Sequence, residues 1–544
     1  MPTHEVTNQV PPLAGHDIAD YPVLLDAVER EGARWALDEV HELGRLAGTA
    51  EVQEWGRLVE KNSPVLRTHD RYGHRVDEVD FHPNYHDLMT VAVEHGIHAA
   101  PWADSRRGAH VARAAKLFVW GAADPGHLCP ISMTYAAVPA LRAAPDLAAT
   151  YEPLLTASTY DYGLRVPSTK QAVIAGMSMT EKQGGSDVRA NTTRATPRPD
   201  GSYELVGHKW FTSAPMSDFF LTLAQAPGGL SCFFVPRVLP DGSRNPIRLQ
   251  RLKDKLGNRS NASSEIEYDG ASAWLVGEEG RGVPTIIEMV NMTRLDCTVA
   301  SAAGMWFGVL QAGHHTRHRS AFGKLLVEQP LMTNVLADLA VEAEAAAITA
   351  IRLAGAVDRA VRGDESEVLF RRIGLAVSKY WICKRAPVHA GEALECLGGN
   401  GYVEESGLPR LYREAPLPSI WEGSGNVAAL DTLRAMARQP EAVGAFFDEV
   451  ALAAGADARL DDAVARVQKD LSALDDIEYR ARRVVEQMAL VLQGSLLVRH
   501  GDPAVADAFC ASRLGGDWGV AFGTLPTGVD VGRIISRTAV DAGA

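Results

Sequence analysis

The segment Ser419–Asn426 has the sequence SIWEGSGN, and it connects a proline-containing stretch to a helical pattern that runs to about Arg438. Pro416 and Pro418 disfavour a helix before the segment, and apolar residues recur at helical spacing after it. We therefore expect Glu422 at a loop-to-helix junction beside a bulky aromatic residue. Burial there can raise the pKa of a carboxyl group and suit it to remove a proton from carbon near neutral pH. The alternative is a capping or helix-dipole role.

The composition is that of an ordinary globular protein. Of the 544 residues, 46% are hydrophobic and 22% are charged, and the formal net charge is -14. The negative charge argues against a broadly basic nucleic-acid binder. The six cysteines form no CxxC pair, which predicts reduced, buried thiols. Because the sequence also lacks a signal-peptide pattern and a membrane-spanning apolar run, we expect a cytoplasmic protein without a membrane partner.

The order of the chain predicts a mainly α protein with a central β domain. We expect an N-terminal helical domain over residues 1–170, a β domain over 171–280, a helical bundle over 281–440 and a final helical segment over 441–544. Short apolar runs between Gly and Pro turns predict the strands, among them 203–211, 219–224 and 230–235. Three long amphipathic patterns, 285–319, 331–361 and 367–397, join the helix after Glu422 to predict a four-helix bundle.

Two short motifs in the predicted β domain contain residues suited to binding an anion or a planar ring. Met177–Asp187 reads MSMTEKQGGSD, in which a strand end and a Gly-Gly-Ser turn offer backbone N–H groups and hydroxyls to an anion. The alternative is a plain strand followed by a glycine turn. His208–Ser213 reads HKWFTS, and an aromatic residue followed by Thr at a strand end can cover a planar ring.

Together these motifs resemble the acyl-CoA dehydrogenase flavoprotein superfamily. The matching segments occur in the family's order: Thr180–Asp187, Lys209–Thr212, Arg319–Gly323, Leu397–Tyr402 and Trp421–Ser424. A closer likeness, to the AidB-like branch linked to the DNA alkylation response, extends over nearly the whole chain. It rests on Met179–Thr193, Leu252–Ser263 and Pro409–Glu414, and on the extra C-terminal helical segment.

The resemblance implies a fold, a cofactor and a reaction. The fold would be a helical domain, a flavin-binding β domain and a four-helix bundle, followed by an extra helical domain. Glu422 would remove the α-proton of an acyl-CoA thioester, with FAD as hydride acceptor, and Arg294 would lie near the active site. The alternative for Arg294 is a helix ion pair. A homotetramer would let Arg319 and the Gly398-Gly399 loop reach a flavin of a neighbouring subunit.

The FAD-binding set that the resemblance implies is as follows: Met177, Met179, Thr180, Gly185, Ser186, Trp210, Phe211, Thr212, Ser213, Arg319, Phe322, Gly398, Gly399, Trp421, Ser424 and Asn426. Three features depart from the family pattern: Lys182–Gly184 replaces Pro-x-Ala, Glu395 replaces Gln, and Trp421 replaces Tyr. We therefore expect slow turnover of ordinary acyl-CoA chains. Two other hypotheses remain open: a DNA-associated protective flavoprotein with little turnover, and a flavin oxidase or monooxygenase on the same fold.

Two further features complete the predictions. His314 and His318 are four residues apart, but without an HExxH motif they predict no metal site. The AidB likeness implies non-specific duplex DNA binding, although residues 441–544 carry 10 basic and 16 acidic side chains. The candidate DNA contacts are Arg434, Arg438, Arg480, Arg482, Arg483 and Arg513. The alternative is a solvated helix face with ion pairs.

Overall fold

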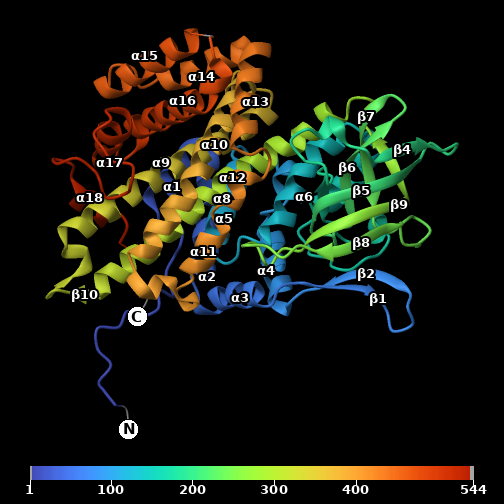
Figure 1. Cartoon of the computed structure of the whole chain (residues 1–544), viewed down its shortest axis with the longest axis horizontal. Helices are drawn as coiled ribbons and strands as arrows, with labels where there is room; N and C mark the ends of the chain where they lie inside the picture. The colour runs from blue at the N-terminus through green and yellow to red at the C-terminus, as the bar shows by residue number, and fades with distance from the viewer. Residues whose placement is uncertain (1–2, 474, 540–544) are drawn as a thin grey trace. The chain divides into compact units, whose positions relative to one another are not determined.

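The computed structural model describes residues 3–473 and 475–539. The chain forms two compact units that do not follow its order. The helical unit comprises Met1–Val52, Arg107–Ala122 and Cys297–Ala544, and the β unit comprises Gln53–Arg106 and Ala123–Asp296. Figure 1 shows helices throughout the chain and one region of strands, which confirms the predicted mainly α fold with a central β domain. The division into four sequence-defined domains stays a prediction.

The β unit is built on a seven-stranded sheet in the order β3-β6-β4-β5-β9-β7, with β8 on β9. Because β6 also pairs with β7, the sheet closes on itself. Its strands are β3 (Ala175–Ser178), β4 (Arg194–Pro197), β5 (Tyr203–Ser213), β6 (Phe219–Ala226), β7 (Gly229–Pro236), β8 (Ile247–Leu252) and β9 (Ser263–Val276). The interior holds fully buried side chains such as Leu205 and Phe233. The expected strands are confirmed, and β9 is longer than the sequence pattern indicated.

A hairpin interrupts the N-terminal segment that was predicted to be mostly helical. β1 (Val65–His69) pairs antiparallel with β2 (Arg75–Asp80). In the turn, the Asp70 carboxylate accepts hydrogen bonds from the N–H groups of Tyr72 (2.8 Å) and His74 (2.9 Å), and Gly73 has φ 84°. This side-chain-to-backbone turn is the sequence signal that could have identified the hairpin. The helices α4 (Pro83–Glu94), α6 (Leu128–Leu141) and α7 (Pro145–Leu155) lie wholly within the β unit.

The helical unit contains the long helices that the sequence predicted. They are α8 (Gly282–His318), α9 (Pro330–Val361), α10 (Glu365–Glu395) and α13 (Gly425–Arg438), and α10 packs against α9 and α13. Their ends carry ordinary start signals: Pro330 opens α9, and the Asp364 side chain accepts from the N–H groups of Ser366 and Glu367 to cap α10. The boundary between the two units lies within α8.

Shorter elements complete the chain. They are α1 (Pro22–Val28), α2 (Leu37–Ala47), α3 (Ala50–Lys61), α5 (Ala109–Trp120), β10 (Ser320–Ala321), β11 (Lys324–Leu325), α11 (Leu408–Glu414), α12 (Leu417–Ile420), α14 (Pro440–Ala451), α15 (Ala458–Ser472), α16 (Ile477–His500), α17 (Pro503–Phe509) and α18 (Val531–Ser536).

In the described part of the chain, no helix is both long and apolar enough to cross a membrane. All six cysteines are free thiols, and all but the half-buried Cys129 are buried.

Buried ion pairs join the C-terminal segment to the long helices of its own unit. Glu449 on α14 pairs with Arg352 on α9 at 2.6 Å, and Arg513 pairs with Asp338 and Glu342 of the same helix. Breaking such a pair on one side leaves a buried charge uncompensated and is strongly destabilising. The segment after residue 440 therefore belongs to the same compact unit as α9 and α10.

Candidate active site

Glu422 lies in a short loop with an unusual backbone. The loop follows α12 and ends where α13 begins at Gly425, with Ser424 as the N-cap. Glu422 has φ 56° and Gly423 has φ 101°. A non-glycine residue in the left-handed region costs about 1–2 kcal/mol, and such strain gathers at functional sites. The predicted loop-to-helix junction is confirmed. The expectation of no helix before it is wrong, because Pro416 and Pro418 occupy the N-cap and first turn of α12, where proline is tolerated.

A buried lysine holds this loop from both sides. The Lys379 ammonium, on α10, donates hydrogen bonds to the carbonyl oxygens of Trp421 and Gly423, each at 2.6 Å. Lys379 is 1% exposed. The two carbonyls belong to the Trp421–Glu422 and Gly423–Ser424 peptide units, so the lysine holds the backbone at two points that span Glu422 and Gly423.

In the β unit, the turn after β3 presents donors to solvent. The N–H of Gly184 donates to the Glu181 carbonyl at 3.0 Å, but in the described chain the N–H groups of Gly185 and Ser186 have no acceptor. A Cβ on Gly185 would lie 2.4 Å from the Thr180 hydroxyl oxygen, so glycine is required where the turn folds back on Thr180. Adjacent free N–H groups of this kind form a concavity that suits a phosphate.

A buried ion pair supports that turn. Glu181 and Lys209 are both fully buried, and Lys209 Nζ lies 2.9 Å from Glu181 Oε1. Glu181 also accepts hydrogen bonds from Thr192 and Thr193. Burial alone would raise the pKa of the Glu181 carboxyl, but the Lys209 charge and these hydrogen bonds hold that pKa well below its usual range. The pair anchors the turn to β5.

The Trp-Phe-Thr stretch of β5 contains a bulge. Lys209 pairs with Ile266 of β9, and Thr212 pairs with Ser264, so one extra residue is accommodated between the two pairings. The Lys253 ammonium lies 3.3 Å from the centroid of the Trp210 ring and 4.6 Å from that of the Phe211 ring. Trp210 is half-buried and Phe211 is 50% exposed. The bulge therefore places two consecutive aromatic rings against one cation.

Most of the remaining predicted residues of the β unit lie at the ends of β3 and β5. Thr212 is buried, and its hydroxyl lies 2.5 Å from that of Ser178. Met177 pairs with Leu221 of β6, and the Met179 carbonyl accepts a hydrogen bond from Asn191. Ser213 pairs with Ser263 of β9. Arg294 is a buried residue on α8.

The predicted residues of the helical unit, apart from the Glu422 loop, lie at its surface. Arg319 follows α8, and its guanidinium donates to the Asn8 carbonyl. Phe322 is 100% exposed in the β10–β11 turn with φ 53°. Gly398 and Gly399 are exposed, and a Cβ on either would meet open space. In Figure 1, β10 is labelled beside the yellow start of α9. Asn426 is exposed in the first turn of α13.

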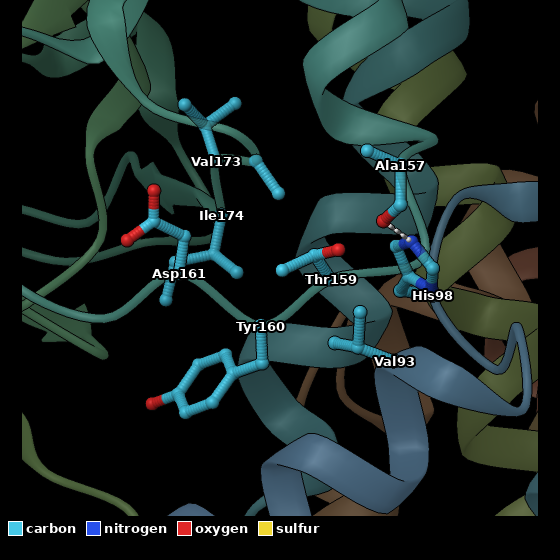
Figure 2. A pocket seen from close by; sticks show the side chains of 9 residues that line it. Val93, His98, Ala157, Thr159, Tyr160, Asp161, Val173 and Ile174 are labelled. Atoms are coloured by element: carbon cyan, nitrogen blue, oxygen red, sulfur yellow. Dashed lines mark hydrogen bonds between the residues drawn. The ribbon is translucent and has the colours of Figure 1, made fainter.

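The β unit contains a very small cavity and a larger one. The one in Figure 2 has a volume of about 10 Å³ and is lined by His98, Tyr160 and Asp161 among others; there the His98 ring Nε2 donates to the Ala157 carbonyl at 2.9 Å. It has room for about one water molecule and no organic ligand. The other has a volume of about 330 Å³, and its lining includes Lys253 and Lys255.

Three family models match consecutive parts of the chain. "Adaptive response protein AidB N-terminal domain" matches residues 8–162, "Acyl-CoA dehydrogenase, middle domain" matches 176–271, and "Acyl-CoA dehydrogenase, C-terminal domain" matches 280–437. AidB of Escherichia coli (strain K12) is 46% identical over 511 residues, which cover 93% of this chain and 94% of that protein. The chain belongs to the acyl-CoA dehydrogenase family.

Other members of the family are also similar. Acyl-CoA dehydrogenase family member 11 of Caenorhabditis elegans is 33% identical over 498 residues, 84% of this chain and 79% of that protein. The crystal structure of Caenorhabditis elegans ACDH-11 in complex with C11-CoA is 29% identical, with a TM-score of 0.85 over 94% of both chains. This acyl-CoA dehydrogenase is AidB-like, as the sequence predicted, and is an acyl-CoA dehydrogenase-type flavoprotein oxidoreductase.

The β unit of this acyl-CoA dehydrogenase fits the family's cofactor, FAD. The free N–H groups of Gly185 and Ser186 are the donors that a phosphate requires, and the partly exposed Trp210 and Phe211 are aromatic residues of the kind that contacts a planar ring system. Nothing in the sequence indicated two residues that contact the site residues: Lys253, beside Trp210 and Phe211, and Lys379, which bonds to the Glu422 loop. Each acts through a tertiary contact, so no local pattern around it could have shown its role.

Proposed function

We propose that this acyl-CoA dehydrogenase removes the α- and β-hydrogens of an acyl-CoA thioester, with Glu422 as the base. The observation that carries this proposal is the left-handed backbone of Glu422, a strained conformation at the one acid of the loop. A carboxylate presented in this way can take the α-proton, and general-base action contributes about 10²–10⁴-fold to the rate. Arg294 is proposed to assist near the thioester.

The FAD-binding roles follow from the two local structures. Gly185 and Ser186, with Thr180, would hold the phosphates, and Trp210, Phe211 and Thr212 would contact the ring system. When bound, FAD accepts the hydride from the β-carbon. Met177, Met179 and Ser213 of the β unit, and Trp421, Ser424 and Asn426 of the helical unit, complete the proposed set. Phe322, Gly398 and Gly399 are exposed and Arg319 is half-buried, which supports the proposal that these residues reach FAD in a neighbouring copy of a homotetramer.

The substrate class is tested by anaerobic titration of the purified FAD-loaded protein with a panel of acyl-CoA thioesters. We expect the flavin absorbance to bleach with at least one thioester. The first thioester to test is one with an acyl chain of medium length, because the structure of the similar ACDH-11 is of its complex with C11-CoA. Turnover of straight chains should stay below about 10 per second, a typical enzyme value, because Trp421 and Glu395 depart from the family pattern. No bleaching with any thioester would contradict the dehydrogenase proposal, and rapid reoxidation by oxygen would favour an oxidase.

A second proposed function, non-specific binding of duplex DNA, is favoured by a group of exposed arginines. Arg434 and Arg438 on α13, and Arg482 and Arg483 on α16, are exposed, and these two helices pack together. In the described chain none of the four forms a salt bridge. Partial burial lowers the pKa of the nearby Lys384, and the positive charges of Arg482 and Lys379 lower it further, which indicates a locally positive region.

The structure corrects the predicted set at two positions. Arg513 is buried and paired with Asp338 and Glu342, so its guanidinium cannot face DNA. Arg480 donates to the carbonyls of Asp470, Ala473 and Asp475, which uses its donors within the α15–α16 connection. Neither role was visible in the sequence, where both are simply arginines of the C-terminal segment.

Replacing Arg482 and Arg483 by alanine is expected to weaken retention on duplex DNA at about 50 mM salt. The slope of the logarithm of the binding constant against the logarithm of the salt concentration should become shallower by about 2 if both residues contact phosphates. Each phosphate contact contributes about 0.9 to this slope. The control removes the same charge elsewhere, with Arg71→Ala and Lys61→Ala, and should bind like the parent. No retention of the parent protein, or retention that does not depend on salt, would contradict phosphate-driven binding.

A further inference from the structure

The strongest unassigned feature is the contact between Lys379 and the Glu422 loop. One ammonium group, buried within α10, bonds to the carbonyl oxygens of Trp421 and Gly423 at 2.6 Å each. These residues are the direct neighbours of Glu422, and they are 42 and 44 positions away from Lys379 in the chain. A single side chain thus bonds to the peptide unit before Glu422 and to the one after Gly423, and it holds the backbone that lies between them.

The loop needs such support because its backbone is strained. Glu422 and Gly423 both have positive φ, and an isolated glutamate would leave the left-handed region for a more favourable one. The two short hydrogen bonds to a charged donor are stronger than neutral ones and oppose that relaxation. The hydrogen bonds from Lys379 therefore hold Glu422 in its strained backbone conformation.

The charge of Lys379 acts on the loop through its backbone. In the part of the chain that the structure describes, no carboxylate forms a salt bridge with this ammonium, whose bonds are to the two carbonyls. Hydrogen bonds from a charged donor are about twice as strong as neutral ones, so the two bonds hold the loop firmly.

We propose that Lys379 is a positioning residue for Glu422, which holds the base in its strained orientation. This inference rests on the proposed function, because it assigns Lys379 an effect only through Glu422. A displacement of about 1 Å at a catalytic group can cost about 10²-fold in rate. Loss of Lys379 should therefore reduce the rate of the chemical step while substrate and cofactor remain bound.

The test compares Lys379→Met, which preserves length but removes the donors and the charge, with Lys379→Gln, which retains an N–H donor without charge. In Lys379→Met, the rate constant of flavin reduction at saturating acyl-CoA should fall by about 10–100-fold. Half-saturation by acyl-CoA, FAD content and the unfolding midpoint should stay close to the parent values. Lys379→Gln should recover part of the rate, because its amide N–H can still donate to one of the two carbonyls.

The outcomes separate this inference from the proposed function. Parental rates in Lys379→Met, alongside an inactive Glu422→Gln, would overturn the positioning role and leave the base assignment intact. A parental rate in Glu422→Gln would overturn the base assignment itself. Loss of FAD or weaker substrate binding that accounts for the whole effect would show that Lys379 is only structural. If Lys379→Met does not fold, the rate of flavin reduction, the half-saturation and the FAD content of Lys379→Gln decide by the same criteria.

Discussion

Glu422→Gln is expected to lower the rate of flavin reduction by acyl-CoA by about 10²–10⁴-fold, the usual contribution of a general base. The amide has nearly the same shape as the carboxyl group but cannot accept the α-proton. Because the loop conformation depends on backbone carbonyls that bond to Lys379, the substitution leaves those hydrogen bonds available. FAD content and affinity for the thioester should therefore remain near the parent values.

Rapid mixing of the FAD-loaded variant with the best thioester of the panel measures this effect. Glu365→Gln is the matched control, because it makes the same chemical change at an exposed glutamate at the start of α10. If Glu422→Gln reduces its flavin as fast as the parent protein, Glu422 is not the base. If it loses FAD, the loop has a structural role that the contacts do not indicate.

Lys209→Met is expected to lower the free energy of unfolding by about 3–5 kcal/mol, the usual cost of breaking a buried ion pair on one side. The Lys209 ammonium is the charged partner of Glu181 and also donates to the Leu223 carbonyl at 2.7 Å. Its removal leaves a carboxylate in the interior. Because this pair anchors the turn that carries Gly185 and Ser186, FAD uptake should fall as well.

The dependence of stability on pH distinguishes this mechanism from simple loss of packing. In the parent protein the pKa of Glu181 lies below its unfolded value, so the pair stabilises the fold above that unfolded pKa and the contribution is lost as pH falls. Without Lys209, burial raises the pKa of Glu181, so the variant should instead lose stability as pH rises. Lys209→Met combined with Glu181→Gln should recover much of the loss, and chemical denaturation across pH measures both effects. Equal stability of the single and double variants would contradict the ion-pair explanation.

The sequence by itself determined the order of the chain and most of its elements. Hydrophobic periodicity predicted α8, α9, α10 and α13 within a few residues, because amphipathic patterns of this length specify helices directly. Alternating and apolar runs between turn residues likewise predicted β5 to β8. The ordered short motifs were sufficient to predict the family, which the similarity to AidB confirmed. The β1–β2 hairpin was missed because its strands are short and half exposed.

Only the tertiary structure decided how the site residues are held. Lys379 reaches the Glu422 loop, Lys253 covers Trp210 and Phe211, and Arg513 is enclosed by acids of α9. Each contact joins segments that are far apart in the chain. The residues next to a charged side chain in the sequence do not indicate which distant residue it will contact. The positive φ of Glu422 was equally hidden, because the sequence predicts such a conformation reliably only for glycine. Local periodicity therefore determined the elements, whereas long-range hydrogen bonds and buried charges decided the geometry of the candidate site.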